Sequence, residues 1–259
     1  MVTFTGTGQI STPIKSINDD KTVTTEYCSK YGFKEGGYYY FFNVLEELDI
    51  PGEYYIDRDD GILYFYPPDE NENSKILLST SNENIISITE KASNITIGGL
   101  TLQGTRNDAL MVAGENCKIV NCAIKNAAEC GINVSGKNNL VENCEVTFIG
   151  KDAVMLSGGS EEGFIYGNNT VTNNSLHDYG EIQKTYIAGV NISGIGNTVS
   201  HNEIYNAPHM GIYYMGNENV MEYNYIHDVV LQSSDAGAIY TGYSYSTYGN
   251  VVRYNCISN

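Results

Sequence analysis

Residues 197–204 read Asn-Thr-Val-Ser-His-Asn-Glu-Ile, and this stretch is one copy of a pattern that recurs from residue 95 to the last residue. Each copy has an anchor residue, with an aliphatic side chain two residues after it and an aliphatic or Met three residues before it. Successive anchors lie 22, 22, 30, 28, 22 and 31 residues apart, so the shortest repeat is 22 residues and three repeats carry insertions. The anchors are Leu100, Cys122, Cys144, Asn174, Asn202, Asn224 and Asn255.

A repeat of this length is typical of a solenoid. Within each copy, apolar residues recur at every second or third place between Gly and Asn, which indicates a short strand rather than a helix. A second apolar strand follows in most copies, for example at 189–194 and 211–216. Strands that recur in one order without a helical crossover stack in parallel, coil on coil. We therefore predict an all-β fold, a right-handed parallel β-helix with a minimal coil of 22 residues.

The anchor changes from Leu and Cys to Asn after residue 144. Stacked Asn side chains can hydrogen-bond to one another and to turn backbone, and an inward amide needs such partners. We interpret Asn174, Asn202, Asn224 and Asn255 as an architectural ladder.

The two ends of the chain differ from the repeat. Residues 1–80 are predicted to form a β-rich segment packed on the solenoid, which occupies residues 81–259. In this segment, residues 53–57 and 62–66 flank Arg58-Asp59-Asp60-Gly61 and read as a β-hairpin ended by Pro67-Pro68. The last residue, Asn259, falls in mid-coil. We expect the natural protein to continue beyond it and the open coil to allow end-to-end self-association.

Charge and cysteine usage exclude several classes of protein. The net charge is −17, with 14 basic and 31 acidic residues, which argues against nucleic acid and against an anionic membrane surface as partners. No apolar run is long enough to span a bilayer, and Met1 to Ser11 lack the order of a signal peptide. The six cysteines form no matched pair of Cys-x2-Cys motifs, so we expect no metal and no other cofactor.

Insertions in a solenoid map to loops, often on one binding face. The extra residues are 158–167, 178–187, 228–237 and 243–248, and we expect these loops to wall a groove whose floor is the second strand. Asp235 ends an inserted loop just before a strand, and two small residues follow it. Asp152 is its nearest analogue, also just before a strand. Two carboxylates on one groove suit glycosidic bond cleavage, although each could instead be a strand-start cap.

Other polar residues fall beside the same groove in this interpretation. His177 and His227 each lie three residues after an anchor, so they would stack in one row and flank the groove. Four residues after their anchors lie Asp178, Asn206 and Asp228, which we interpret as turn formers at the ends of the strands. The candidate substrate-binding residues are His209, His177, His227, Tyr186 and Tyr240.

Three stretches resemble large right-handed parallel β-helix proteins. Residues 43–57 read Asn-Val-Leu-Glu-Glu-Leu-Asp-Ile-Pro-Gly-Glu-Tyr-Tyr-Ile-Asp, residues 206–212 read Asn-Ala-Pro-His-Met-Gly-Ile, and residues 235–242 read Asp-Ala-Gly-Ala-Ile-Tyr-Thr-Gly. Over residues 35–259 the chain resembles the carbohydrate-active group around glycoside hydrolase family 141. Tyr54 stands where that family has Trp. The resemblance implies fucosidase- or xylanase-type activity through two Asp residues, one carried onto Asp235 and the other in a coil past Asn259.

The leading hypothesis is therefore a glycoside hydrolase acting on a poly- or oligosaccharide, extracellular or at the cell surface in its full-length form. A polysaccharide lyase is an alternative, with Lys151, Lys184 or Arg106 serving the reaction. A chain of charge −17 is an unfavourable host for an anionic polymer, which weighs against that alternative. A glycan-binding or adhesin solenoid that does not cleave its ligand is the third hypothesis.

Overall fold

A computed structural model describes residues 2–4, 8–28, 32–33, 35–68, 76–242 and 244–259. The chain divides into two compact units, Met1–Leu77 and Leu78–Asn259. The first unit holds short antiparallel strands and one turn of 3-10 helix, Leu45–Glu47. Its strands are β1 (Val2–Phe4), β2 (Ile10–Thr12), β3 (Ile14–Ile17), β4 (Val23–Thr25), β5 (Tyr39–Phe41), β6 (Tyr54–Asp57) and β7 (Ile62–Phe65).

The hairpin predicted over residues 53–66 is confirmed by the antiparallel pairing of β6 with β7. Its acidic tip is held by Asp57, whose Oδ1 accepts the backbone N–H groups of Asp59 and Asp60. No helix in the described part of the chain is long and apolar enough to cross a membrane.

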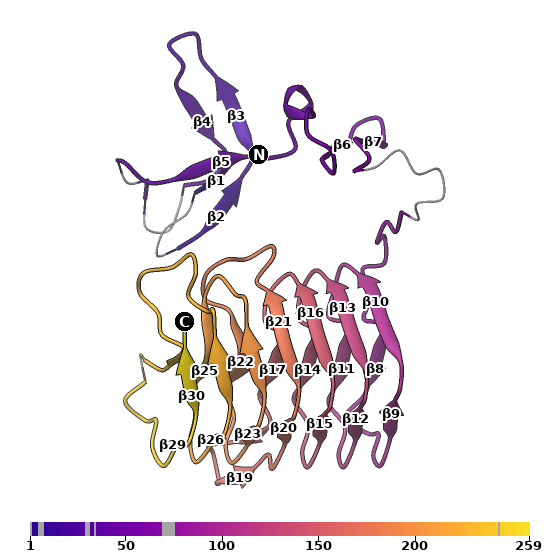
Figure 1. Cartoon of the computed structure of the whole chain (residues 1–259), viewed down its shortest axis with the longest axis vertical. Helices are drawn as coiled ribbons and strands as arrows, with labels where there is room; N and C mark the ends of the chain where they lie inside the picture. The colour runs from indigo at the N-terminus through magenta and orange to yellow at the C-terminus, as the bar shows by residue number, and fades with distance from the viewer. Residues whose placement is uncertain (1, 5–7, 29–31, 34, 69–75, 243) are drawn as a thin grey trace. The chain divides into compact units, whose positions relative to one another are not determined.

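The second unit is a solenoid of three parallel sheets, each with seven described strands (Figure 1). We call them sheets A, B and C in the order in which a coil visits them. Sheet A contains β9 (Thr96–Gly98), β12 (Lys118–Val120), β15 (Leu140–Glu142), β20 (Thr170–Thr172), β23 (Thr198–Ser200), β26 (Val220–Glu222) and β29 (Val251–Arg253). Sheet B contains β10 (Thr101–Thr105), β13 (Ala123–Ala127), β16 (Glu145–Ile149), β21 (Ser175–Tyr179), β24 (Glu203–Tyr205), β27 (Tyr225–His227) and β30 (Cys256–Ser258). Sheet C contains β8 (Ile86–Ile88), β11 (Leu110–Val112), β14 (Ile132–Val134), β17 (Val154–Leu156), β22 (Ala188–Ile192), β25 (Met210–Tyr214) and β28 (Ile239–Tyr240).

The register of sheet B confirms the repeat. The aliphatic residues two places after the anchors lie opposite one another from coil to coil, and all but the last are buried. They are Leu102, Ile124, Val146, Leu176, Ile204, Ile226 and the exposed Ile257. Burial of a rung such as Val146 or Leu176 contributes about 1.5–3 kcal/mol for each side chain, so this inner ladder supplies much of the core.

One prediction about the strands was wrong. Residues 197–204 are not one strand but two, β23 and β24, which belong to different sheets. His201 lies between them with φ +57°, a left-handed conformation that turns the chain out of sheet A. The same corner has positive φ in the neighbouring coils, at Asn121, Asn143, Asn173, Tyr223 and Tyr254. Asn tolerates this conformation better than most residues, which explains its recurrence at the turn.

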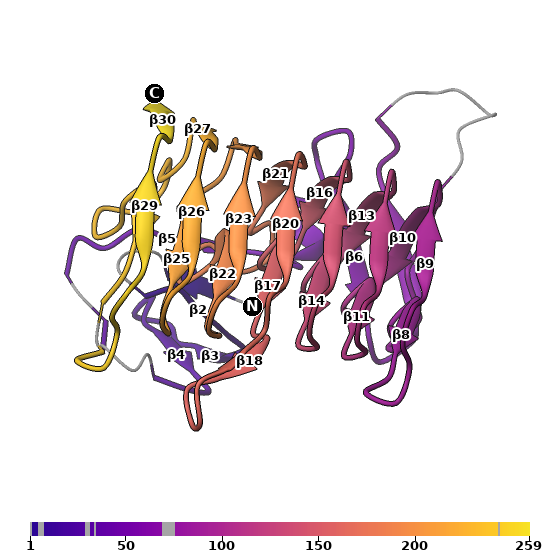
Figure 2. The ribbon, with the colours of Figure 1, turned by 90° about the horizontal axis from the view of Figure 1, so that it is seen from below.

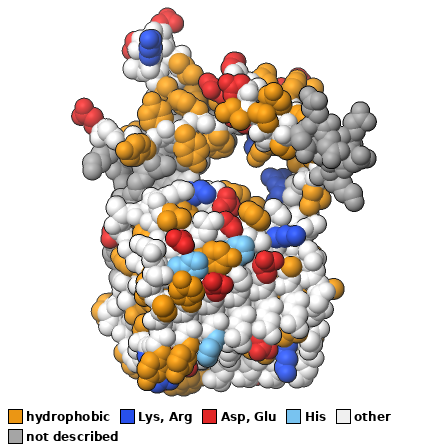
Figure 3. Space-filling view, viewed as in Figure 1, with side chains coloured by type: hydrophobic (Ala, Val, Ile, Leu, Met, Phe, Trp, Pro, Cys, Tyr) orange, Lys and Arg blue, Asp and Glu red, His pale blue; other side chains and the backbone are white. Residues whose placement is uncertain are grey.

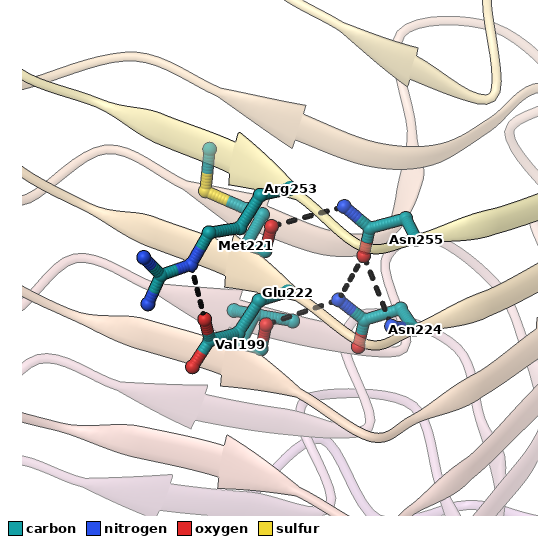
Figure 4. A network of polar contacts seen from close by, with 6 residues as sticks. All are labelled: Val199, Met221, Glu222, Asn224, Arg253 and Asn255. Carbon is teal, nitrogen blue, oxygen red and sulfur yellow. Dashed lines mark hydrogen bonds and ion pairs between the residues drawn. The ribbon is translucent and has the colours of Figure 1, made fainter.

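The anchor ladder is confirmed. Asn202 is buried, and its Oδ1 accepts from both the backbone N–H and the Nδ2 of Asn174. Its own Nδ2 donates to the Val171 carbonyl and to Oδ1 of Asn224. Figure 4 shows the next step, where Asn255 accepts from Asn224 and donates to the Met221 carbonyl. Each amide thus forms hydrogen bonds with backbone groups that the turn leaves unpaired.

A second asparagine ladder was missed. It lies five residues before the anchors, where the chain enters sheet A. The Oδ1 atom of each member accepts the backbone N–H of the equivalent residue one coil earlier, as between Asn197 and Asn169 at 3.2 Å. The constant spacing of five to each anchor was visible in the sequence. Its members are Asn139, Asn169, Asn197, Asn219 and Asn250.

The insertions leave the solenoid at two different corners, not on one side as predicted. Residues 178–187 and 228–237 join sheet B to sheet C, whereas 158–167 and 243–248 join sheet C to sheet A. Residue 243 lies outside the described residues. The loop 158–167 contains a small hairpin of β18 (Gly159–Ser160) and β19 (Ile165–Tyr166), and Figure 2 shows β18 at the turn that follows β17. An inserted loop keeps the corner of the strand it follows, so the two pairs of loops cannot wall one common groove.

Candidate functional site

The corner between sheets B and C carries two inserted loops that fold back on the preceding coil. Backbone N–H groups of Glu181, Ile182 and Gln183 donate to the carbonyls of Ile149 and Gly150. In the later insertion, backbone N–H groups of residues 230–232 donate in the same way to the carbonyls of residues 207–209. The loops are therefore fixed against the solenoid by main-chain hydrogen bonds, and they hold the side chains at this corner in place.

Asp152 begins the sheet C strand in its coil and is buried, with 4% of its surface exposed. Its Oδ1 accepts the backbone N–H of Ala188 at 2.7 Å and Nδ2 of Asn191 at 3.3 Å, both in the next coil. Burial raises the pKa of Asp152 to about 6, against these hydrogen bonds. Asp108 makes the same bridge two coils earlier, to Cys130 N and Asn133 Nδ2. This geometry is that of a strand-start cap between coils.

Asp235 is exposed and lies beside His209, a neighbour from the preceding coil. Only 3% of His209 is exposed, and its Nδ1 has no hydrogen-bond partner in the described part of the chain. Burial lowers the pKa of His209, while a hydrogen bond to the Ile187 backbone and the charge of Asp235 oppose that change. Tyr186 lies against the same imidazole, with ring centroids 6.1 Å apart. We call Tyr186, His209 and Asp235 the corner cluster.

The outer face of sheet C beside the corner cluster carries two tyrosines. Tyr240 stacks on Tyr213 of the preceding coil, with ring centroids 6.3 Å apart and planes 26° apart. Tyr213 was not among the predicted site residues. The sequence held a signal for it, because Ile212-Tyr213 and Ile239-Tyr240 occupy the same register in successive coils.

The two candidate carboxylates do not form one pair. The strands that follow Asp152 and Asp235 are β17 and β28, and β22 and β25 lie between them in sheet C. Three steps of a parallel stack amount to about 14 Å. The carboxyl groups that flank one glycosidic bond are about 5–9.5 Å apart, so Asp152 and Asp235 cannot act on the same bond. The expectation of a shared groove for both is corrected by this separation.

His177 and His227 stand in one row as predicted, but on a different sheet from Tyr240. Both lie on the outer face of sheet B, on β21 and β27, whereas Tyr240 belongs to sheet C. They stand in one row with Tyr205 between them, and the ring centroids are 4.6 and 4.9 Å apart. Figure 3 shows His, Asp and Glu side chains gathered on this face of the solenoid. The five predicted substrate-binding residues therefore divide between two surfaces.

The basic residues proposed for a lyase are partly engaged by acids. Lys151 pairs with Glu129 of the preceding coil, and Lys184 lies 3.8 Å from Glu181 within its own loop. Among the described residues, no group of three or more His, Cys, Asp or Glu side chains is arranged to hold a metal ion, and the cysteines are free thiols.

Comparison with known families places this architecture. A family model described as a right handed beta helix region matches residues 84–259. The chain belongs to this right-handed β-helix family. Membership confirms the fold predicted from the repeat and does not single out one activity. A search of curated proteins gave no match.

Three solved structures illustrate the likeness of this right-handed β-helix protein to others. It is 14% identical to pectate lyase Pel9A, with a TM-score of 0.49, over 67% of this chain and 44% of the other. It is 11% identical to the enzymatically active domain of bacteriophage CBA120 tailspike protein 2, with a TM-score of 0.47, over 68% and 32%. It is 16% identical to the A-module of the mannuronan C-5 epimerase AlgE4 from Azotobacter vinelandii, with a TM-score of 0.39, over 64% and 56%. The chain thus spans less than two thirds of each, and the likeness concerns the fold alone.

Proposed function

We propose that this protein is a glycoside hydrolase that binds a poly- or oligosaccharide at the corner cluster, with Asp235 as one catalytic carboxylate. The observation that carries the proposal is the placement of an exposed carboxylate beside a buried imidazole whose Nδ1 is unpartnered. Titratable groups brought together in this way at a loop-lined corner are the usual mark of a reactive site.

The corner cluster leaves room for a ligand next to Asp235. Ala236 and Gly237 follow the carboxylate and place little side-chain bulk beside it. Tyr186 lies near the end of the inserted loop 178–187 and Tyr240 follows the inserted loop 228–237, and their rings and hydroxyls can contact a sugar. Small residues beside a carboxylate and aromatic residues around it are what close approach of a pyranose requires.

Hydrolysis of a glycosidic bond uses one group to protonate the leaving oxygen and a second to activate water or attack the anomeric carbon. Asp235 would supply one of these groups. His209, kept neutral by its burial, would support the ring of Tyr186, which lies against its imidazole. Asp152 is too distant to be the second group, and the resemblance to glycoside hydrolase family 141 assigns that group to a later coil.

A polysaccharide lyase is a second candidate, and one observation favours it. Burial lowers the pKa of His209, so its imidazole stays neutral at neutral pH, and the free Nδ1 could accept a proton. In such a reaction the base removes the proton next to a uronate carboxyl, the C4–O bond breaks, and an unsaturated sugar forms. The net charge of −17 opposes a polyuronate, which is why we rank this candidate second.

Turnover by the full-length protein on neutral polysaccharides and on polyuronates, measured by reducing ends and by absorbance of unsaturated products, tests the proposal. We expect new reducing ends without unsaturated products, and a loss of at least about 100-fold in Asp235→Asn. Glu161→Gln removes one exposed charge from the β18–β19 hairpin, at another corner of the solenoid, and should keep full turnover. Unsaturated products lost in His209→Gln would assign a lyase. Turnover that survives in Asp235→Asn would remove that residue from catalysis, and binding without products would indicate a glycan-binding solenoid.

A further inference from the structure

A row of stacked rings runs across the outer face of sheet B, away from the corner cluster. His177, Tyr205 and His227 occupy one register in three successive coils. Their planes are nearly parallel, 13° apart in the first pair and 4° apart in the second. Tyr225 stacks on His227 from the same strand, with centroids 4.5 Å apart. We call these four residues the ring row.

The flat faces of the rings in the ring row stack on one another. Both faces of Tyr205 are covered by imidazoles one coil away on either side, and His227 lies between two tyrosines. A ligand on this surface therefore meets ring edges, which carry imidazole nitrogens and phenolic hydroxyls. These groups form hydrogen bonds and leave no flat face on Tyr205 for stacking.

Each imidazole of the ring row lies between two carboxylates. His177 Nδ1 is 2.6 Å from Asp178 Oδ2, and its Nε2 is 3.7 Å from Glu145 Oε1. The same pattern recurs at His227 two coils later, a step of about 10 Å along the solenoid. There, His227 Nδ1 is 2.8 Å from Asp228 Oδ2, and its Nε2 is 3.4 Å from Glu203 Oε1.

The charge of this surface has one sign. Among the described residues from Glu145 to Ser258, the outward positions of sheet B carry no Lys or Arg. Three of the four carboxylates have more than half of their side-chain surface exposed, namely Glu145, Glu203 and Asp228. In these three, the oxygen that does not face an imidazole is therefore open to a ligand, whereas Oδ1 of Asp178 accepts Nδ2 of Asn206. The charge complementary to the open oxygens is positive.

We propose that the ring row binds an amino-sugar chain that runs along the solenoid axis. Its ammonium groups would bind the carboxylate pair Glu145 and Asp178 and the carboxylate pair Glu203 and Asp228, two coils apart. Its hydroxyls would form hydrogen bonds with the ring edges between these two carboxylate pairs, above all with Tyr205. The site is on a different sheet from the corner cluster, so it does not depend on the proposed hydrolase activity.

A sugar chain fits this surface better than a basic peptide does. The edge of Tyr205 lies between the two acidic pairs, where it can bond a hydroxyl or amine but not a lysine methylene. Each lysine stem immobilised on the surface also costs about 0.5–1.5 kcal/mol in side-chain entropy. An amino sugar carries its ammonium and hydroxyls on one rigid ring and avoids this cost.

Calorimetric titration of the full chain with fully deacetylated and fully N-acetylated glucosamine oligosaccharides of one length tests the proposal. The pH should be one at which the amines of the deacetylated chain are protonated. We expect the deacetylated chain to bind at least about tenfold more tightly, since charge-assisted hydrogen bonds are lost on acetylation. The double variant Glu203→Gln/Asp228→Asn should weaken its binding about tenfold or more, and Tyr205→Phe by less.

The matched control is Glu161→Gln/Glu162→Gln, which removes two exposed charges from the loop of the β18–β19 hairpin. It should change the affinity by less than about twofold, because charges that far away are screened. Equal weakening in the control would show that net charge alone attracts the ligand and would overturn the site. Absence of binding, or equal affinity for the acetylated chain, would overturn it as well. Oligolysine that binds as tightly, with the same sensitivity to the double variant, would replace the sugar by a basic peptide.

Discussion

The Nδ2 atom of Asn174 lies 2.9 Å from Oδ1 of Asn202, one coil further along the solenoid. The same contact recurs between Asn202 and Asn224 at 3.0 Å and between Asn224 and Asn255 at 2.9 Å. Four coils are thus joined by side-chain amides that also close backbone groups of the turn. Because each amide bonds to the coils on both sides, the loss of one amide weakens two interfaces between coils.

We predict that Asn202→Ala lowers the free energy of unfolding by about 3–5 kcal/mol, because four hydrogen bonds are lost and buried groups on both neighbouring coils remain unpaired. Urea unfolding at neutral pH measures the change. Cys144→Ala is the matched control at the same anchor register and should cost only about 1–2 kcal/mol, since a thiol is replaced by a smaller apolar group. Equal losses in the two variants would contradict the role of the amides.

Asp152→Asn should remove a dependence of stability on pH. The folded-state pKa of Asp152 is raised from 3.8 to about 6, so its contribution to stability is full below about pH 3.8 and is lost as pH rises through about 6. The difference corresponds to up to about 3 kcal/mol. Since Asn keeps an Oδ1 acceptor for the Ala188 N–H, the variant should be the more stable form at pH 8. Denaturation at a series of pH values checks this, and an unchanged profile would refute it.

If the corner cluster is catalytic, the activity should fall with decreasing pH as His209 gains its proton. The pKa of His209 lies below 6.5 because the side chain is buried, so the acid limb of the kcat/KM profile should lie below that value. In His209→Gln the limb should vanish together with most of the rate. Asp228→Asn, next to the partly buried His227, should leave it in place. A limb that persists unchanged in His209→Gln would assign it to another group.

Phe148→Asn should stabilise the solenoid by about 1 kcal/mol. Phe148 has φ +53° and is half exposed, at a register where the other coils place Gly104, Asn126, Asp178 or Asn206. A bulky residue in this conformation is strained, and Asn relieves the strain without loss of buried surface. Phe148→Ala is the control and should gain little, because Ala is also disfavoured there. Thermal unfolding of both variants separates the effect of conformation from that of hydrophobic exposure.

The rungs of the fold could be predicted from the sequence because one register of apolar residues repeats in every coil. The aliphatic row from Leu102 to Ile257 and the ladder from Asn174 to Asn255 follow directly from this periodicity. The division of the first predicted strand between sheets A and B could not be predicted in the same way. A left-handed residue such as His201 ends one strand and begins another without an interruption in the apolar pattern.

The candidate site was predicted only in part for a related reason. Periodicity shows which residues share a rung, and it correctly stacked His177 with His227. It does not show which of three faces a rung occupies, so those residues were grouped with Tyr240 on another sheet. The effect of the Asp235 charge on His209 depends on how a loop folds back on the previous coil, which the residues alone do not reveal.

The corners of the solenoid have a consequence for engineering and evolution. The backbone N–H of Ala188 reaches a side chain 36 residues earlier across a single coil boundary, while that of Cys130 does so across 22 residues. Closing the longer of two such loops costs less than about 1 kcal/mol extra. Corner loops are therefore interchangeable cassettes, and a new specificity could be grafted onto one coil while the rungs beneath it stay in place.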